Sequence, residues 1–154
     1  MESIKGALLK SAPFKRLTEE ELHQILALCR QHAYSEGDIV FSEGTSAEDL
    51  YIITDGIIVM EMKLAVYPGW VQKAMVEVLR HGDAFGWSSV LGSHVYTMTA
   101  KAMEPSKVIT IDGTYLHRLL DQQPDIGYKV MLGLVEVASS RVWGVKRAVF
   151  ALPS

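Results

Sequence analysis

Apolar and polar positions change their spacing twice along this chain, from helical to alternating and back to helical. From position 18 to position 30 apolar residues recur every three or four positions, and Thr18 precedes Glu21 in a capping-box pattern. The apolar residues of this stripe are Leu22, Ile25, Leu26 and Cys29. A shorter helical turn or two precedes it and ends near Ser11, because Pro13 disfavours helical backbone at Ala12.

The middle of the chain, from Tyr34 to Asp112, has the composition of strands and turns. It is rich in Val, Ile, Tyr, Thr and Phe and is interrupted repeatedly by glycine. Asp55-Gly56 lies between two runs of β-formers and predicts a tight two-residue hairpin with a type I′ turn. A longer hairpin is predicted to join residues 60–66 to residues 71–79 across Tyr67-Pro68-Gly69-Trp70. Many short strands in about eighty residues indicate a small antiparallel barrel or jelly roll.

After Asp112 the spacing is helical again. A short helix over residues 115–120 is predicted to end near Pro124, and the longest helix runs from there to Phe150. One stripe of this helix, called the seam below, alternates steps of three and four for about three heptads. The seam consists of Tyr128, Met131, Val135, Ala138, Val142, Val145 and Val149, and a second stripe of Val130, Leu134 and Val137 lies beside its first half. We expect the second stripe to cover the β-structure and the seam to join two copies into a homodimer, which Val142→Glu would separate.

Composition narrows the functional classes. The chain has 154 residues, of which 49% are hydrophobic and 21% charged, so it is long enough for one domain with its own core. A net charge of −3 gives no general attraction for nucleic acid. The lone Cys29 forms no intrachain disulfide, and no apolar run is long enough to span a membrane or to act as a secretion signal. We therefore expect a cytoplasmic protein with no membrane partner.

Three stretches together make the sequence recognisable: GDIVFSEGTSAEDLYIITDGIIVM (37–60), VLRHGDAFGWSSVLGSHVYTMTAKA (78–102) and VITIDGTYLHRLLDQQPDIGYKVM (108–131). In order and spacing they resemble the cyclic-nucleotide-binding domain of the catabolite-activator (Crp/Fnr) superfamily. The resemblance extends from about Leu17 to Val142. It implies a regulatory domain in which an effector binds between a phosphate-binding cassette, here residues 78–102, and the β-roll, and in which the long helix moves in response.

The cassette departs from the family pattern at two positions. In the family, Phe-Gly is followed by a glutamate that accepts a hydrogen bond from the ribose hydroxyl, and an arginine before a Ser/Thr neutralises the phosphate. Phe85, Gly86 and Thr97 match this pattern, whereas Trp87 stands at the glutamate and Tyr96 at the arginine. We therefore predict that cyclic AMP and cyclic GMP bind weakly or not at all.

Two interpretations of this altered cassette remain. In the first, Trp87 and Tyr96 stack on a flat ligand while Ser88 and Ser89, at a helix N-terminus, hold an anion; the ligand contacts are then Phe85, Gly86, Trp87, Ser88, Ser89, Tyr96 and Thr97. In the second, the two rings fill the nucleotide cavity and the serines only cap a helix. The domain is then a ligandless dimerisation or protein-interaction module.

No motif in the sequence indicates catalysis or a metal. The five histidines have no paired nucleophile or carboxylate in a recognisable motif, and His94 is a solvated loop residue in our interpretation. We expect no enzymatic activity, no cofactor and no metal. We expect a single domain over residues 1–154, with N-terminal helices at 1–33, a β-barrel at 34–112 and C-terminal helices at 113–154. Because the sequence ends at Ser154, we expect no DNA-binding domain and no direct contact with nucleic acid.

Overall fold

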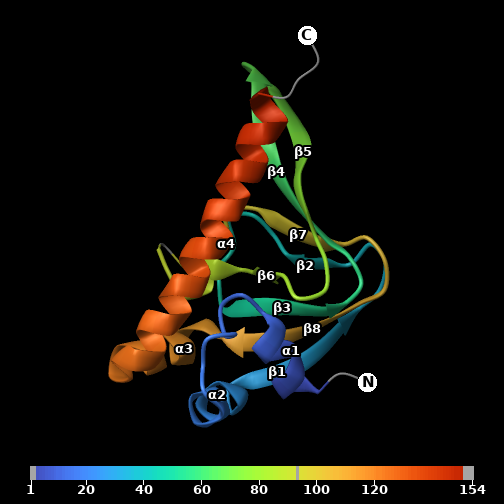
Figure 1. Ribbon diagram of the computed structural model, residues 1–154. Helices are drawn as coiled ribbons and strands as arrows, with labels where there is room; N and C mark the ends of the chain where they lie inside the picture. Colours follow the sequence, from blue (N-terminus) through green and yellow to red (C-terminus); the bar gives the residue numbers. More distant parts are fainter. Residues whose placement is uncertain (1–2, 93, 151–154) are drawn as a thin grey trace.

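In the described residues, eight strands lie between an N-terminal and a C-terminal pair of helices; Figure 1 shows their arrangement. The computed structural model describes residues 3–92 and 94–150, and the side chains among them except those of Val66 and residues 142–150. The helices are α1 (Ile4–Lys10), α2 (Glu19–Leu26), the 3₁₀ helix η1 (Trp87–Ser89), α3 (Gly113–Gln122) and α4 (Pro124–Phe150). The strands are β1 (Cys29–Tyr34), β2 (Ile39–Phe41), β3 (Asp49–Asp55), β4 (Ile58–Tyr67), β5 (Trp70–Leu79), β6 (Ala84–Phe85), β7 (Thr99–Ala102) and β8 (Ser106–Asp112).

The strands form two antiparallel sheets of four. One sheet has the order β1-β8-β3-β6 and the other β2-β7-β4-β5. Every pairing within them is antiparallel. Neither sheet closes on itself, so the predicted jelly roll is confirmed as an open roll of two sheets rather than a closed barrel.

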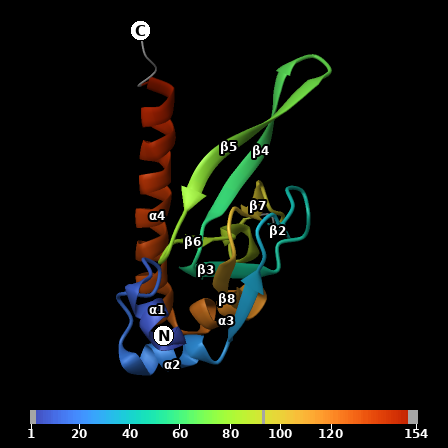
Figure 2. The same ribbon diagram turned by 90° about the vertical axis from the view of Figure 1, so that its right-hand side faces the viewer.

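Two hydrophobic clusters hold these layers together. Alternation along β3 explains both, because successive side chains of a strand point to opposite faces. Leu50 and Ile52 face the helices, while Tyr51 and Ile53 face the second sheet. In Figure 2 α1, α2 and α3 accordingly lie on one side of the first sheet and the second sheet on the other, while α4 runs past both sheets.

The N-terminal helices follow the predicted pattern with one correction. Thr18 caps α2, accepting from the Glu21 N–H at 3.2 Å while the Glu21 carboxylate accepts from the Thr18 N–H at 2.9 Å. The helix ends at Leu26, however, and Cys29 begins β1 instead of continuing the helical stripe. Cys29 still packs against the helical cluster, and burial raises the pKa of its thiol to about 12. The β-structure therefore starts five residues earlier than the predicted boundary at Tyr34.

The prediction of a tight two-residue hairpin at Asp55-Gly56 is wrong. Gly56 has φ +94°, but Asp55 lacks the positive φ that a type I′ turn requires, and β3 and β4 belong to different sheets. The physical reason is a contact with a residue far away in the sequence. A Cβ on Gly56 would lie 2.2 Å from Ser106 Oγ, and this hydroxyl oxygen accepts a hydrogen bond from the Ile57 N–H at 3.2 Å. The turn is thus packed against β8 and carries the chain from one sheet to the other.

The long hairpin is confirmed. Strands β4 and β5, each of ten residues, pair from Ile58↔Leu79 to Tyr67↔Trp70, with Pro68-Gly69 as the turn. This is the most extended feature of the second sheet (Figure 2).

The last two helices also follow the prediction. Val130 and Leu134 are buried and Val137 is half-buried, so the second stripe covers the body of the domain. At Gly133 the helix approaches the N-terminal segment so closely that a Cβ would lie 2.4 Å from the Ala12 carbonyl oxygen. Most of the described part of the seam is exposed: Val135 is 65% exposed, and Tyr128 and Ala138 are exposed as well. Met131 is the exception, since it is half-buried and packs against the cluster beneath the helices. The side chains of Val142, Val145 and Val149 lie outside the described residues.

Candidate functional site

The predicted ligand contacts of the cassette begin where β6 passes into η1. Gly86 joins them with φ +84°, and a Cβ there would lie 2.9 Å from both the Asp49 carbonyl oxygen and the Tyr51 ring. Only glycine fits this close, left-handed position without strain. Phe85 is fully buried just before it and stacks on Tyr51 at 4.9 Å between ring centroids. The first two predicted contacts therefore form the floor of the cassette.

Tyr96, which the family resemblance predicts at the position of the arginine, is packed into the roll. Its ring stacks on Phe41 with 3.6 Å between centroids and 10° between planes, and the residue is only 5% exposed. Its hydroxyl donates to the Asp49 carbonyl oxygen at 2.8 Å and accepts from the Asp49 N–H at 3.1 Å. These contacts tie the loop before β7 to the start of β3.

The aromatic cluster around Tyr96 carries no charge at neutral pH. Phe41, Tyr51 and Phe85 pack within 6 Å of one another, measured between ring centroids. Burial, more than any other cause, raises the pKa of Tyr51 and of Tyr96 above the ordinary value for tyrosine. No Lys, Arg, Asp or Glu occurs from Ala84 to Ala100. This stretch of the cassette therefore supplies no fixed cation to neutralise a phosphate.

Trp87 packs on the opposite side of the first sheet from Tyr96. Its ring belongs to the cluster beneath the helices, whereas Tyr96 belongs to the cluster between the sheets. The indole Nε1 is buried and has no hydrogen-bond partner among the described residues. The structure thus separates the two aromatic rings into different clusters.

The polar residues of the cassette differ in whether their side chains already form hydrogen bonds within the domain. Ser89 is 1% exposed and its hydroxyl donates to the Gly86 carbonyl oxygen at 2.8 Å, so it stabilises η1 from within. Ser88 is half-buried and Thr97 is exposed, and neither side chain has a hydrogen bond in the described part of the chain. Among the predicted polar contacts, these two hydroxyls remain available to a ligand.

Arg141 connects α4 to the strand that leads into the cassette, and sequence reasoning missed it. Its guanidinium donates to the Ala84 carbonyl oxygen and lies 3.1 Å from the Glu77 carboxylate on β5. Burial raises the pKa of Glu77 and the nearby Arg141 opposes that rise. The sequence does contain a signal for Arg141, because position 141 continues the stripe of Val130, Leu134 and Val137 by one further helical step.

A polar cavity of about 470 Å³ lies on the face of the first sheet that carries Tyr51. Arg30, Thr110 and Tyr51 form one row across β1, β8 and β3, and the next neighbour of Tyr51 in that row is Phe85. Asp49 also lines the cavity, and burial followed by the charge of Asp112 raises its pKa. The described residues contain no group of three or more His, Cys, Asp or Glu placed to hold a metal ion.

Removing the Tyr96 hydroxyl should destabilise the fold. In Tyr96→Phe the Asp49 N–H and C=O lose their partner in a partly buried place, and we expect a loss of about 1–2 kcal/mol in the free energy of unfolding. Urea denaturation measures it, with the exposed Tyr115→Phe as the control that should change little. Equal midpoints for the two variants would show that the Tyr96 hydroxyl contributes nothing.

Two open antiparallel sheets, a short helix entered through a left-handed glycine, and a long C-terminal helix define a cyclic-nucleotide-binding-like domain. The family model for the cyclic nucleotide-binding domain matches residues 31–123, and the chain belongs to that family. The family expectation drawn from the sequence is therefore confirmed.

Two proteins of similar sequence agree with this assignment. The chain is 27% identical over 117 residues to a Rhodopseudomonas palustris protein assigned as a potassium channel, and 25% identical over 114 residues to isozyme 1 of the cGMP-dependent protein kinase of Drosophila melanogaster. The matches cover 76% and 73% of this chain but only 27% and 15% of those proteins.

Solved structures share the fold at low sequence identity. A cyclic nucleotide-binding domain from Methylobacillus flagellatus matches with a TM-score of 0.82 at 17% identity, over 97% of this chain and 85% of its own. The catabolite activator protein of Thermus thermophilus matches with a TM-score of 0.72 at 20% identity, over 92% of this chain and 63% of its own.

In the part of the chain that the structure describes, no helix is both long and apolar enough to cross a bilayer.

Proposed function

We propose that this chain is a non-catalytic, effector-sensing regulatory domain whose cassette does not hold cyclic AMP or cyclic GMP tightly. One observation supports the proposal: the ring of Tyr96, the residue that the resemblance assigns to the arginine position, is stacked on Phe41 inside the roll. The cassette therefore offers an aromatic surface and hydroxyl groups where the family pattern offers a cation.

The energetic consequence of this exchange is large. A phosphate anion without its guanidinium partner loses about 1.5–3 kcal/mol, and loss of the ribose contact at Trp87 adds a comparable amount. Since about 1.4 kcal/mol corresponds to a factor of ten, the affinity falls by roughly two to four decades. An effector of this cassette is accordingly a flat or weakly anionic metabolite. Of the contacts predicted from the sequence, we propose that the Tyr96 ring and the hydroxyls of Ser88 and Thr97 meet the effector. Phe85 and Ser89 are buried, and Trp87 packs on the other side of the first sheet.

Binding and output are connected through two sets of contacts. An effector that displaces the Tyr96 ring from Phe41 also breaks its two hydrogen bonds to Asp49. A shift of β6 moves Arg141, which is bonded to the Ala84 carbonyl oxygen, and with it α4. The exposed seam on α4 then carries the change to a second copy in a homodimer.

The same packing of Tyr96 favours a second candidate. A ring that is 5% exposed and hydrogen-bonded at its hydroxyl fills space as a core residue does. In that case the roll is a ligandless scaffold for dimerisation or for another protein. For either candidate we propose a cytoplasmic location, since no apolar run in the sequence is long enough for a membrane span or a secretion signal. We also propose no direct contact with nucleic acid, since the net charge is −3.

A thermal-shift screen separates the two candidates. A sensor gains stability by RT ln(1 + [L]/Kd) with at least one metabolite of a panel of flat anions and nucleotides, and a filled scaffold gains none. The gain should be reduced in Thr97→Ala, because the exposed Thr97 hydroxyl has no other partner in the described residues. A panel without any shift would leave the scaffold as the function.

A further inference from the structure

The distal half of the β4–β5 hairpin is an apolar projection. From Met62 to Val76 the sequence reads MKLAVYPGWVQKAMV, in which ten residues are apolar and the only charges are two lysines. Tyr67 and Trp70 flank the turn and are 69% and 72% exposed, and Leu64, Val71 and Met75 are exposed as well. In Figures 1 and 2 this half of the hairpin extends beyond the rest of both sheets. An apolar surface of this kind on a soluble domain indicates a partner.

The two lysines indicate the charge of this partner. Lys63 and Lys73 are exposed and directly opposite each other in the β4–β5 register. Like charges in such a pair destabilise a hairpin unless an anion lies between or beside them. Neither ammonium group has an ion pair in the described part of the chain, and Glu43 reaches only the Lys63 backbone N–H, at 3.3 Å. The surface is therefore complementary to a negatively charged partner.

The order of side chains along the hairpin fits a layered partner. The amphipathic rings of Tyr67 and Trp70 come first, Leu64 and Val71 follow, and the lysine pair lies four residues behind Tyr67, about 13 Å along the strand. Side chains of proteins that lie in a membrane interface reach about 5–10 Å into it, with Trp and Tyr at the headgroup level. With the two rings at that depth, lysine positions about 13 Å behind them lie just outside the headgroups, and the lysine stems allow the ammonium groups to reach the phosphates.

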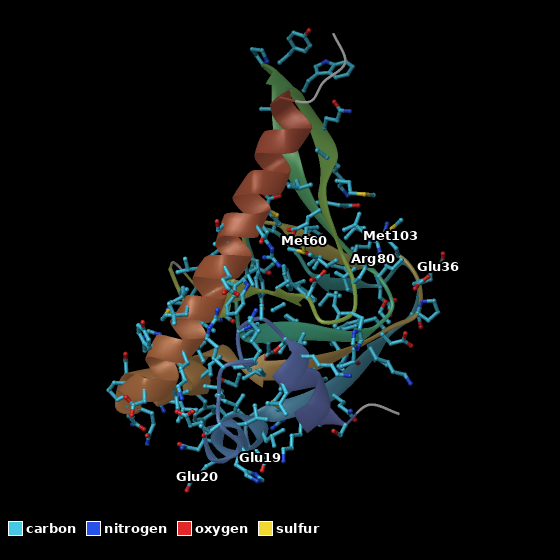
Figure 3. All side chains as sticks on the ribbon, viewed as in Figure 1. Glu19, Glu20, Glu36, Met60, Arg80 and Met103 are labelled. Atoms are coloured by element: carbon cyan, nitrogen blue, oxygen red, sulfur yellow. The ribbon has the colours of Figure 1, made fainter. Side chains whose placement is uncertain are left out.

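We propose that the tip of the β4–β5 hairpin docks on the surface of an anionic lipid bilayer. Met60 and Arg80, labelled in Figure 3, lie at the other end of the hairpin near the body of the domain, and Met60 is buried. The hairpin thus has a fixed base and a free amphipathic tip. This contact goes against the sequence expectation of no membrane partner, which rested on the lack of a spanning segment; a surface contact needs none. It is also independent of whether the cassette binds an effector.

Vesicle sedimentation of the full chain tests the proposal. Wild type should bind vesicles of phosphatidylcholine with one quarter phosphatidylglycerol clearly more tightly than vesicles of phosphatidylcholine alone. Lys63→Gln/Lys73→Gln should weaken binding to anionic vesicles by about 25-fold, at about fivefold per lysine. Tyr67→Ser/Trp70→Ser should weaken it by about tenfold or more. Lys107→Gln and Tyr115→Ser, which change exposed residues far from the tip in sequence, should bind as wild type does.

A second measurement keeps the test decisive. Sedimentation velocity without lipid determines whether the Tyr67→Ser/Trp70→Ser variant changes its oligomeric state. If the variant loses self-association while wild type shows no preference for anionic vesicles, the tip is covered by a second copy and the membrane proposal is overturned. Failure of wild type to bind anionic vesicles at millimolar lipid overturns it as well.

Discussion

A Trp87→Glu/Tyr96→Arg variant binds cyclic AMP about 10²–10⁴ times more tightly than the natural chain. The arginine supplies the charge-assisted contact to the phosphate and the glutamate accepts from the ribose hydroxyl, and each is worth about 1.5–3 kcal/mol. The substitution also removes the Tyr96 ring from its stack on Phe41, which opens space beside the cassette. Isothermal titration calorimetry measures the gain directly.

The control for this variant carries the same charges one residue away. Trp87→Glu/Val95→Arg keeps the Tyr96 ring in place and adds the arginine at an exposed position. It should therefore gain at most the contribution of the glutamate, about 10- to 100-fold, and lack the part that the arginine supplies. Because loss of Tyr96 also removes two hydrogen bonds, circular dichroism should establish that both variants are folded before the titration. Equal affinity of the two variants would show that position 96 does not correspond to the family's arginine.

Placing a charge on the seam separates the proposed dimer. Val135 is 65% exposed at the centre of the described part of the seam, and a twofold axis along α4 would bring it close to its own copy. In Val135→Glu two carboxylates then face one another in a desolvated place, and we expect the dimer dissociation constant to rise by at least about a hundredfold. Sedimentation velocity at micromolar concentration measures this.

The matching control uses the same helix on a different face. Ser140 is exposed and lies about 140° around the helix axis from Val135, so Ser140→Glu should leave the dimer intact. Val142, where the sequence pattern first placed this test, has a side chain outside the described residues. A natural chain that sediments as a monomer, or a dimer that Val135→Glu leaves unchanged, would contradict both the seam and the route from cassette to output.

Local patterns in the sequence predicted most of the fold. The capping box at Thr18, the long hairpin closed by Pro68-Gly69 and the two stripes of α4 each depend on residues a few positions apart. Such interactions leave a spacing that can be recognised without knowledge of the rest of the chain. The family resemblance added the order of the strands and the position of the cassette.

The predictions that failed concern residues whose conformation depends on contacts with residues far away in the sequence. Cys29 continues a helical stripe in sequence, yet its backbone pairs with Ile111 on β8. Asp55-Gly56 has the composition of a hairpin turn, yet Ser106 holds it as a crossing between sheets. In the cassette, the sequence predicted exchanges at Trp87 and Tyr96 but did not indicate that the two rings pack on opposite sides of one sheet. Which side a ring occupies depends on the packing of the whole domain.

Calorimetric titration of the natural chain with cyclic AMP and with cyclic GMP tests the central claim most directly. Tyr96 is stacked on Phe41 and the cassette has no fixed cation from Ala84 to Ala100, so we predict dissociation constants above about 100 µM or no measurable heat for both nucleotides. A dissociation constant at or below a few micromolar for either nucleotide would show that backbone amides and hydroxyls suffice to hold the phosphate, and would contradict the account.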